Sequence, residues 1–229
     1  MKTVAVIGGG PAGIMAAAMA AQNGHSVKLF EKNEKIGKKL YITGKGRCNI
    51  TNDCDTEDFF LNIPRNPKFL YSALYGFTNA DIVSIINSMG VPTKVERGKR
   101  VFPVSDKSSD VIKALSRYLD RSGAELCLNS NVKSIKKTDQ GFELTVNGGI
   151  QAFDAMILCT GGSSYPTTGS NGAGYAFARE MGHTVTDIRP SRIPLATAEQ
   201  WPAELTGLSL KNVTLRAYNK KGKLVYELS

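Results

Sequence analysis

The sequence has few of the residues that build metal centres, and it has no long apolar run. Its 229 residues include two histidines and four cysteines, and Cys48, Cys54, Cys127 and Cys159 lack the close paired spacing of a zinc site. No stretch approaches the roughly 20 consecutive apolar residues that span a membrane as a helix. We therefore expect a globular, cytoplasmic protein with no metal ion and no membrane partner.

Acidic residues are also scarce: 20 aspartates and glutamates stand against 29 lysines and arginines, which gives a net charge of +9 at pH 7. Much of this excess falls between residues 28 and 47, where seven basic residues accompany two acidic ones. Apart from Phe30 in the apolar run, only Tyr41 supplies an aromatic ring there, and no nucleic-acid-binding module is visible, so we expect no nucleic acid partner. Cofactor phosphates or an anionic small-molecule substrate explain the excess, and most of these lysines form a solvated face.

A glycine-rich turn dominates the N-terminus, where the motif Gly8-Gly9-Gly10-Pro11-Ala12-Gly13 follows a short apolar run. In a strand–turn–helix unit of this kind, Gly8 permits the tight turn and Gly10 lets the backbone approach a diphosphate closely. Gly13 lets the helix lie close to the sheet. The free N–H groups at the start of the helix then favour an anion. The motif predicts a bound dinucleotide.

An acidic residue at the end of the second apolar run strengthens this prediction. Glu31 follows residues 27–30 and lies eighteen residues beyond Gly13. At the tip of a second strand, its carboxylate would accept hydrogen bonds from a ribose diol. A carboxylate there disfavours a phosphorylated ribose, so NADP is not expected in this slot.

The rest of the chain alternates helical and strand-like segments. Residues 37–52 are polar and punctuated by glycine, as loops that carry functional sites commonly are. We expect helices at 13–22, within 69–89, at 109–122 and at 175–181. We expect an antiparallel insert of short strands over about 124–153, a central strand at 155–159, and further strands at 213–218 and 224–228.

These elements predict an α/β fold in two parts. Residues 1–192 would form a dinucleotide-binding domain with a parallel central sheet and the antiparallel β-meander. Residues 193–229 would begin a second, β-rich domain. The change in texture beyond Pro190 sets this boundary.

Longer motifs carry a resemblance to a known family. The order of glycine turn, ribose acid, meander and the strand ending in Cys159-Thr160-Gly161-Gly162 resembles the flavoproteins with two dinucleotide-binding domains, in which a Rossmann-like fold holds FAD. The segments 43–52 (TGKGRCNITN), 100–103 (RVFP) and 160–170 (TGGSSYPTTGS) are similar to those of the bacterial YhiN/BaiN-like family of NAD(P)/FAD-dependent oxidoreductases. The resemblance runs from residue 1 to about 200.

The resemblance implies roles for individual residues. The diphosphate would lie on Gly8, Gly10, Pro11, Ala12 and Gly13, the ribose beside Glu31 and Lys32, and the adenine against backbone groups of Val132. Other implied cofactor contacts, along the flavin or from its far side, are Lys39, Gly46, Arg47, Cys48, Asn49, Thr160, Gly161 and Gly162. Arg47 would stabilise negative charge on reduced flavin or hold an anionic substrate. Tyr165 would supply a proton, although simple hydrogen bonding within its loop explains that residue equally well.

The implied activity is an FAD-dependent hydride transfer from a transiently bound NAD(P)H to a small organic substrate, such as the C=C bond of an enone. Two alternatives stay open. A flavin-dependent disulfide reductase would use Cys48 and Cys54, although five intervening residues in a polar loop align the two thiols poorly. A non-catalytic nucleotide-binding module would carry the same fold without chemistry.

The chain length departs from the family pattern, because members run to roughly twice this size. We therefore expect a second chain or a C-terminal half to complete the flavin site, and we expect reduced FAD affinity without it.

Overall fold

The computed structural model describes residues 1–190, 196–208, 210 and 213–228. The chain forms two compact units, Met1–Val185 and Thr186–Ser229, and each is described by itself. The boundary predicted at 192/193 falls among residues 191–195, which lie outside the described residues, and it stays a prediction.

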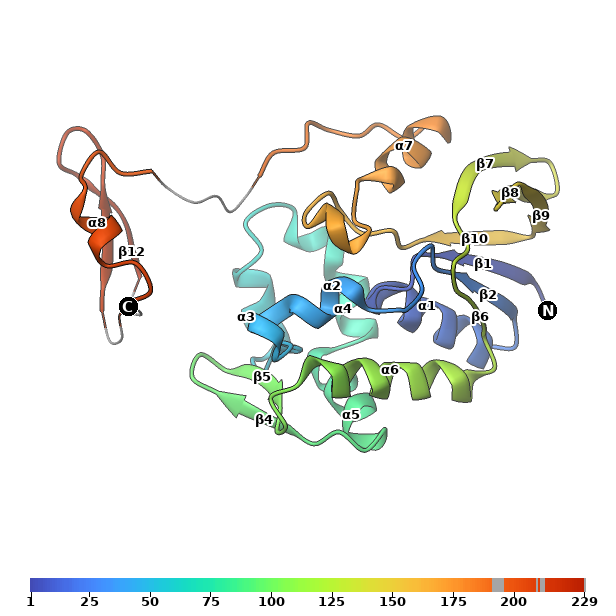
Figure 1. Ribbon diagram of the computed structural model, residues 1–229, viewed down its shortest axis with the longest axis horizontal. Coiled ribbons are helices and arrows are strands. Elements are labelled where there is room, and N and C mark those ends of the chain that lie inside the picture. The colour runs from blue at the N-terminus through green and yellow to red at the C-terminus, as the bar shows by residue number, and fades with distance from the viewer. Residues whose placement is uncertain (191–195, 209, 211–212, 229) are drawn as a thin grey trace. The chain divides into compact units, whose positions relative to one another are not determined.

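The larger unit contains a four-stranded parallel sheet (Figure 1). Its strands are β1 (Thr3–Ile7), β2 (Ser26–Phe30), β6 (Glu125–Cys127) and β10 (Ala155–Leu158), in the order β10-β1-β2-β6. Parallel strands that are covered on both faces are apolar throughout, and β1 is almost fully buried from its second residue on. The fold class predicted from the sequence is confirmed.

The position of β6 corrects one expectation. The sequence predicts that the strand after Gly123 belongs to the antiparallel insert, but β6 pairs in parallel with β2 and extends the central sheet. The meander therefore begins one strand later. It consists of β7 (Val132–Thr138), β8 (Gly141–Val146) and β9 (Gly149–Phe153), which pair antiparallel.

Alternate residues of β1 face two different cores. Val4 and Val6 pack with the helices α1 (Pro11–Gln22) and α6 (Ser108–Ser122) on one side of the sheet. Ala5 and Ile7 pack with the meander and with α7 (Ala173–Glu180) on the other side. Because side chains alternate between the faces of a strand, β1 contributes to the cores on both sides of the sheet.

The segment 37–52, expected as a loop, contains short elements. These are α2 (Lys38–Ile42), a 3₁₀ turn η1 (Thr43–Gly46) and β3 (Thr51–Asn52). β3 pairs with β5 (Arg100–Pro103), which also pairs with β4 (Thr93–Glu96), in a small antiparallel sheet. Left-handed backbone at Gly44, Lys45 and Cys48 keeps the segment from continuing as one helix.

The helical spacing over 69–89 is divided into several pieces. After α3 (Thr56–Leu61) come the turn η2 (Pro67–Leu70), α4 (Tyr71–Gly76) and α5 (Asn79–Ser88). By length and composition alone, residues 67–88 meet the criteria for a membrane span, with a mean hydropathy of 1.2. Extended backbone at Phe77 and a capping box between Thr78 and Asp81 start a new helix there, so no continuous helix covers the window.

The smaller unit holds a short helix, α8 (Trp201–Glu204), and a hairpin of β11 (Leu215–Tyr218) and β12 (Leu224–Leu228). Asn219 closes the hairpin turn, because its side-chain oxygen accepts hydrogen bonds from the N–H groups of Lys221 and Lys223 at 2.9 and 3.0 Å.

Candidate dinucleotide site

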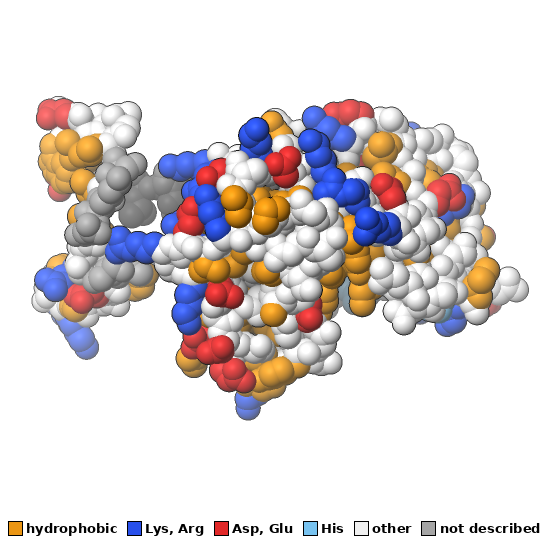
Figure 2. Space-filling model, turned by 90° about the horizontal axis from the view of Figure 1, so that it is seen from below, with side chains coloured by type: hydrophobic (Ala, Val, Ile, Leu, Met, Phe, Trp, Pro, Cys, Tyr) orange, Lys and Arg blue, Asp and Glu red, His pale blue; other side chains and the backbone are white. Residues whose placement is uncertain are grey.

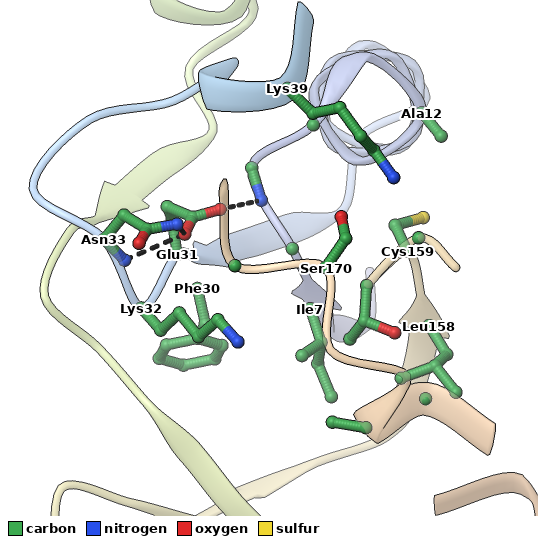
Figure 3. A pocket seen from close by; sticks show the side chains of 18 of the residues that line it. Ile7, Ala12, Phe30, Glu31, Lys32, Asn33, Lys39, Leu158, Cys159 and Ser170 are labelled. Atoms are coloured by element: carbon green, nitrogen blue, oxygen red, sulfur yellow. Dashed lines mark hydrogen bonds between the residues drawn. The ribbon is translucent and has the colours of Figure 1, made fainter. Parts of the chain in front are cut away.

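A cavity of about 660 Å³ opens at the carboxyl ends of β1, β2 and β10. This is the edge at which doubly wound α/β sheets bind their ligands. The following sequence-predicted cofactor residues line the cavity: Gly8, Gly10, Pro11, Ala12, Glu31, Lys32, Lys39, Val132, Thr160 and Gly161. The glycine turn forms one wall, and the segment between β10 and α7 forms the opposite one (Figure 3).

Glycine is required at the three predicted positions for different steric reasons. Gly8 has a φ of +110°, and a Cβ there would lie 2.4 Å from the carbonyl oxygen of Cys159. A Cβ on Gly13 would lie 1.8 Å from the carbonyl oxygen of Gly8, so this glycine allows α1 to pack tightly against the turn. A Cβ on Gly10 would meet no protein atom within 4 Å. Since Gly10 lines the cavity, the space beside it is available to a diphosphate, and the turn fits a dinucleotide.

Glu31 is fixed at the end of β2 by hydrogen bonds to its carboxylate. One oxygen, Oε2, accepts from the N–H of Gly9 at 2.7 Å. The other, Oε1, accepts from the backbone N–H of Asn33 at 2.8 Å and from its side-chain Nδ2 at 2.6 Å. Only 7% of Glu31 is exposed. A carboxylate has about four acceptor positions, so Oε2 retains room for one hydroxyl of a ribose.

Asn33 also reaches the opposite wall, and the sequence prediction did not include it. Its Nδ2 lies 3.4 Å from the carbonyl oxygen of Thr168, next to Gly169. A Cβ on Gly169 would come within 2.8 Å of Asn33 Nδ2 and 3.0 Å of Lys32 Cε, so only glycine allows the wall to approach this closely. The polar residue two positions after Glu31 was the available sequence signal, because Asn readily closes such turns.

Ser170 is the second residue that the prediction missed. It lines the cavity with 7% of its surface exposed. The motif containing Ser170 supported the family resemblance, but nothing in the sequence pointed to its side chain as a contact. Its place on the wall depends on the return of the chain to the sheet through β10, which brings it opposite the glycine turn.

Arg47 lies outside the cavity lining. Its guanidinium donates to Asp106 Oδ1 from Nε at 2.9 Å, donates to Glu96, and stacks over the ring of Phe102 at 4.2 Å. Hydrogen bonds to Glu96 and Asp106 raise the pKa of Arg47. The pKa of Asp106 is lowered by its hydrogen bonds with Lys94 and Arg47. Arg47 therefore ties the segment after α2 to the small antiparallel sheet.

Five other residues predicted for the site also do not line the cavity. Three are neighbours of Arg47, and two belong to the loop after β10. Gly46 and Asn49 belong to the turn around Arg47, and Cys48 is fully buried in the core beside α1. Gly162 lies near Tyr175, and Tyr165 is 63% exposed. The roles implied for these residues along the flavin or in catalysis stay predictions.

The cysteines of the described residues are all free thiols. Burial raises the pKa of Cys48, and burial together with Asp58 raises the pKa of Cys54. A redox-active cysteine needs a lowered pKa, so neither thiol has the expected environment of a disulfide reductase. Within the described part of the chain, no group of His, Cys, Asp or Glu is arranged to hold a metal ion.

The parallel sheet, the glycine turn and the acid at the end of β2 define a Rossmann-type dinucleotide-binding domain. The chain belongs to the family described as HI0933-like protein Rossmann domain, which it matches over residues 2–226. The relatives that match include a curated reductase. The resemblance inferred from the motifs is therefore confirmed.

Curated relatives are similar to this chain over almost its whole length. A 3-dehydro-bile acid delta(4,6)-reductase of Clostridium scindens is 33% identical over 210 residues, which cover 91% of this chain and 51% of the relative. A ribosomal RNA dihydrouridine synthase of Haemophilus influenzae is 32% identical over 218 residues, 93% of this chain and 53% of the relative. The chain thus spans about half the length of the curated relatives it matches.

A solved structure supports the fold. The open conformation of a flavocytochrome c3 fumarate reductase superimposes with a TM-score of 0.59 at 23% identity, over 80% of this chain and 41% of that one.

Proposed function

We propose that this chain is the FAD-binding part of a reductase that adds hydrogen across a C=C bond conjugated to a carbonyl group. The cavity between the glycine turn and the fixed carboxylate of Glu31 is the observation that carries the proposal. Two relatives add support for the reaction, because the delta(4,6) bonds of a 3-oxo steroid and the C5=C6 bond of uridine are both conjugated to a carbonyl.

The residues of the cavity would bind and orient the cofactor. The backbone at Gly10 and the start of α1 would hold the diphosphate at the positive end of the helix. Glu31 Oε2 would accept a hydrogen bond from the ribose, and Val132, which also lines the cavity, would offer backbone groups to the adenine. FAD would supply the hydride, with NAD(P)H as a transient donor of electrons. A second chain or further sequence would complete the surface around the flavin.

Reduction of uridine in RNA is a second candidate, favoured by the net charge of +9 and by the relatives named for it. On the face seen in Figure 2, lysines and arginines are spread among acidic side chains. If RNA is the substrate, added salt should displace the bound RNA. A small enone should bind with little dependence on the salt concentration.

The test begins with binding. The purified chain should bind FAD, and anaerobic NADH or NADPH should bleach its absorbance. Adding a 3-oxo-Δ4 steroid, or a uridine-containing ribosomal RNA fragment, should restore the oxidised spectrum if that compound is reduced. Lack of FAD binding by the wild-type chain would contradict the proposed cofactor.

Gly10→Ala provides a variant that affects the ligand and spares the fold. The new Cβ meets no protein atom within 4 Å, yet it enters the space assigned to the diphosphate. We expect FAD affinity to fall with an unchanged melting temperature. Gly76→Ala is the matched control, because it also adds a Cβ in open space, at the end of α4 and away from the cavity. Equal FAD affinity in the two variants would remove Gly10 from the site.

A further inference from the structure

Ser170 is a buried polar residue whose hydroxyl has no protein partner. Its exposed fraction is 7%, and its Oγ makes no hydrogen bond within the described residues. The oxygen itself keeps some accessible surface, because every fully buried side-chain nitrogen or oxygen of the described residues has a partner. A hydroxyl can donate one hydrogen bond and accept others. Because Ser170 lines the cavity and its hydroxyl points into it (Figure 3), a ligand is the natural partner.

The ammonium group of Lys39 approaches the same space from α2. Lys39 forms no ion pair in the described part of the chain, and Figure 3 shows its side chain extending toward the loop that carries Ser170. An ideal Cβ on Gly161 would lie 3.3 Å from Ser170 Oγ and 3.6 Å from Lys39 Nζ. The missing side chain of Gly161 therefore leaves a space that both polar groups border.

The chemistry of this space selects an anion. Lys39 can only donate hydrogen bonds, and Ser170 can donate one. The carboxylate of Glu31 also lines the cavity, but it accepts hydrogen bonds from Gly9 and Asn33, and its remaining acceptor position is the one assigned to the ribose. A phosphate oxyanion takes charge-assisted hydrogen bonds from donors of this kind.

We propose that Ser170 and Lys39 form a phosphate-binding subsite beside Gly161, which holds the dinucleotide diphosphate from the wall opposite the glycine turn. This inference rests on the proposed function for the identity of the dinucleotide. In this arrangement α1 meets one side of the diphosphate, and the loop between β10 and α7 meets the other. Ser170 is the contact that no sequence motif assigned.

The experiment compares the binding of ADP, adenosine and inorganic phosphate by calorimetry in the wild type and in Ser170→Ala. Removing a hydrogen bond to a charged group should weaken ADP and FAD binding about 10-fold and leave adenosine binding unchanged. Lys39→Gln should also weaken ADP selectively. Ser130→Ala is the matched control, since this serine lines the same cavity but donates its hydroxyl to the Leu128 carbonyl at 3.0 Å.

Each outcome decides the proposal. Selective loss of ADP affinity in Ser170→Ala, with the melting temperature kept, supports the subsite. Equal losses for ADP and adenosine would show a structural role and overturn it, as would unchanged ADP binding. Loss of phosphate binding with ADP unaffected would assign the space to a separate anion and overturn the diphosphate assignment. If the wild type binds ADP through Ser170 but not FAD, the subsite stands and the proposed flavin function fails.

Discussion

Glu31→Gln tests whether the carboxylate at the end of β2 holds the nucleotide-binding wall together. In the wild type, Oε1 accepts two hydrogen bonds from Asn33 and Oε2 accepts one from the N–H of Gly9. A glutamine oxygen can keep the two donors of Asn33, but the amide nitrogen would then face the N–H of Gly9, which was bonded at 2.7 Å. Two donors would oppose each other in a site that is 7% exposed.

The unpaired N–H and the lost charge assistance should lower the free energy of unfolding by about 3 kcal/mol. Urea unfolding should be followed by circular dichroism, because the sole tryptophan of the sequence, Trp201, lies in the smaller unit and does not report on the site. Glu34→Gln is the control: Glu34 is exposed and its ion pair with Lys38 at 2.7 Å lies in water, so its loss should change the stability very little. Equal stability of the two variants would refute the hydrogen-bond network, and FAD affinity should fall only in Glu31→Gln.

Three further substitutions test other parts of the structure. Gly13→Ala should destabilise the chain by about 3 kcal/mol in urea unfolding, because its Cβ would overlap the Gly8 carbonyl and this outweighs the better helix propensity of alanine; a variant as stable as the wild type would contradict the close packing. Arg47→Gln should lower the urea midpoint at pH 6. Because Lys94 and Arg47 lower the pKa of Asp106 from its ordinary 3.8, the difference between the variant and the wild type should fade as the pH falls below 3.8. A difference that persists in acid would point to lost packing instead. Cys54→Ser should keep the flavin content and its reduction by NAD(P)H, measured by absorbance, whereas inactivity with normal flavin would revive the thiol mechanism.

The local part of the fold could be predicted from the sequence. The turn at Gly8 to Gly13, the acid at Glu31 and the amphipathic helix α6 follow from short-range spacing and lie as predicted. The strand β6 was placed wrongly because its partner β2 is about a hundred residues away, and a strand of three residues carries no sequence signal for which strand it pairs with. The division between α4 and α5 depended on the capping box at Thr78, which competes with continuous helical spacing.

The cavity residues could be predicted from the sequence only where a single continuous segment forms one wall of the cavity. Asn33 and Ser170 become part of the site only through long-range contacts, since the loop after β10 faces the end of β2 only once the sheet is assembled. Arg47 shows the opposite case: the motif implied a place beside the flavin, whereas three oppositely charged and aromatic neighbours hold its side chain in the described structure.

The hydrogen bond between Asn33 and the Thr168 carbonyl joins positions 135 residues apart, and this separation has a consequence for biosynthesis. A nascent polypeptide that ends before Ala155 contains the glycine turn but lacks the edge strand β10 beside β1 and the opposing wall of the cavity. Nucleotide capture should therefore wait until the whole larger unit has emerged from the ribosome.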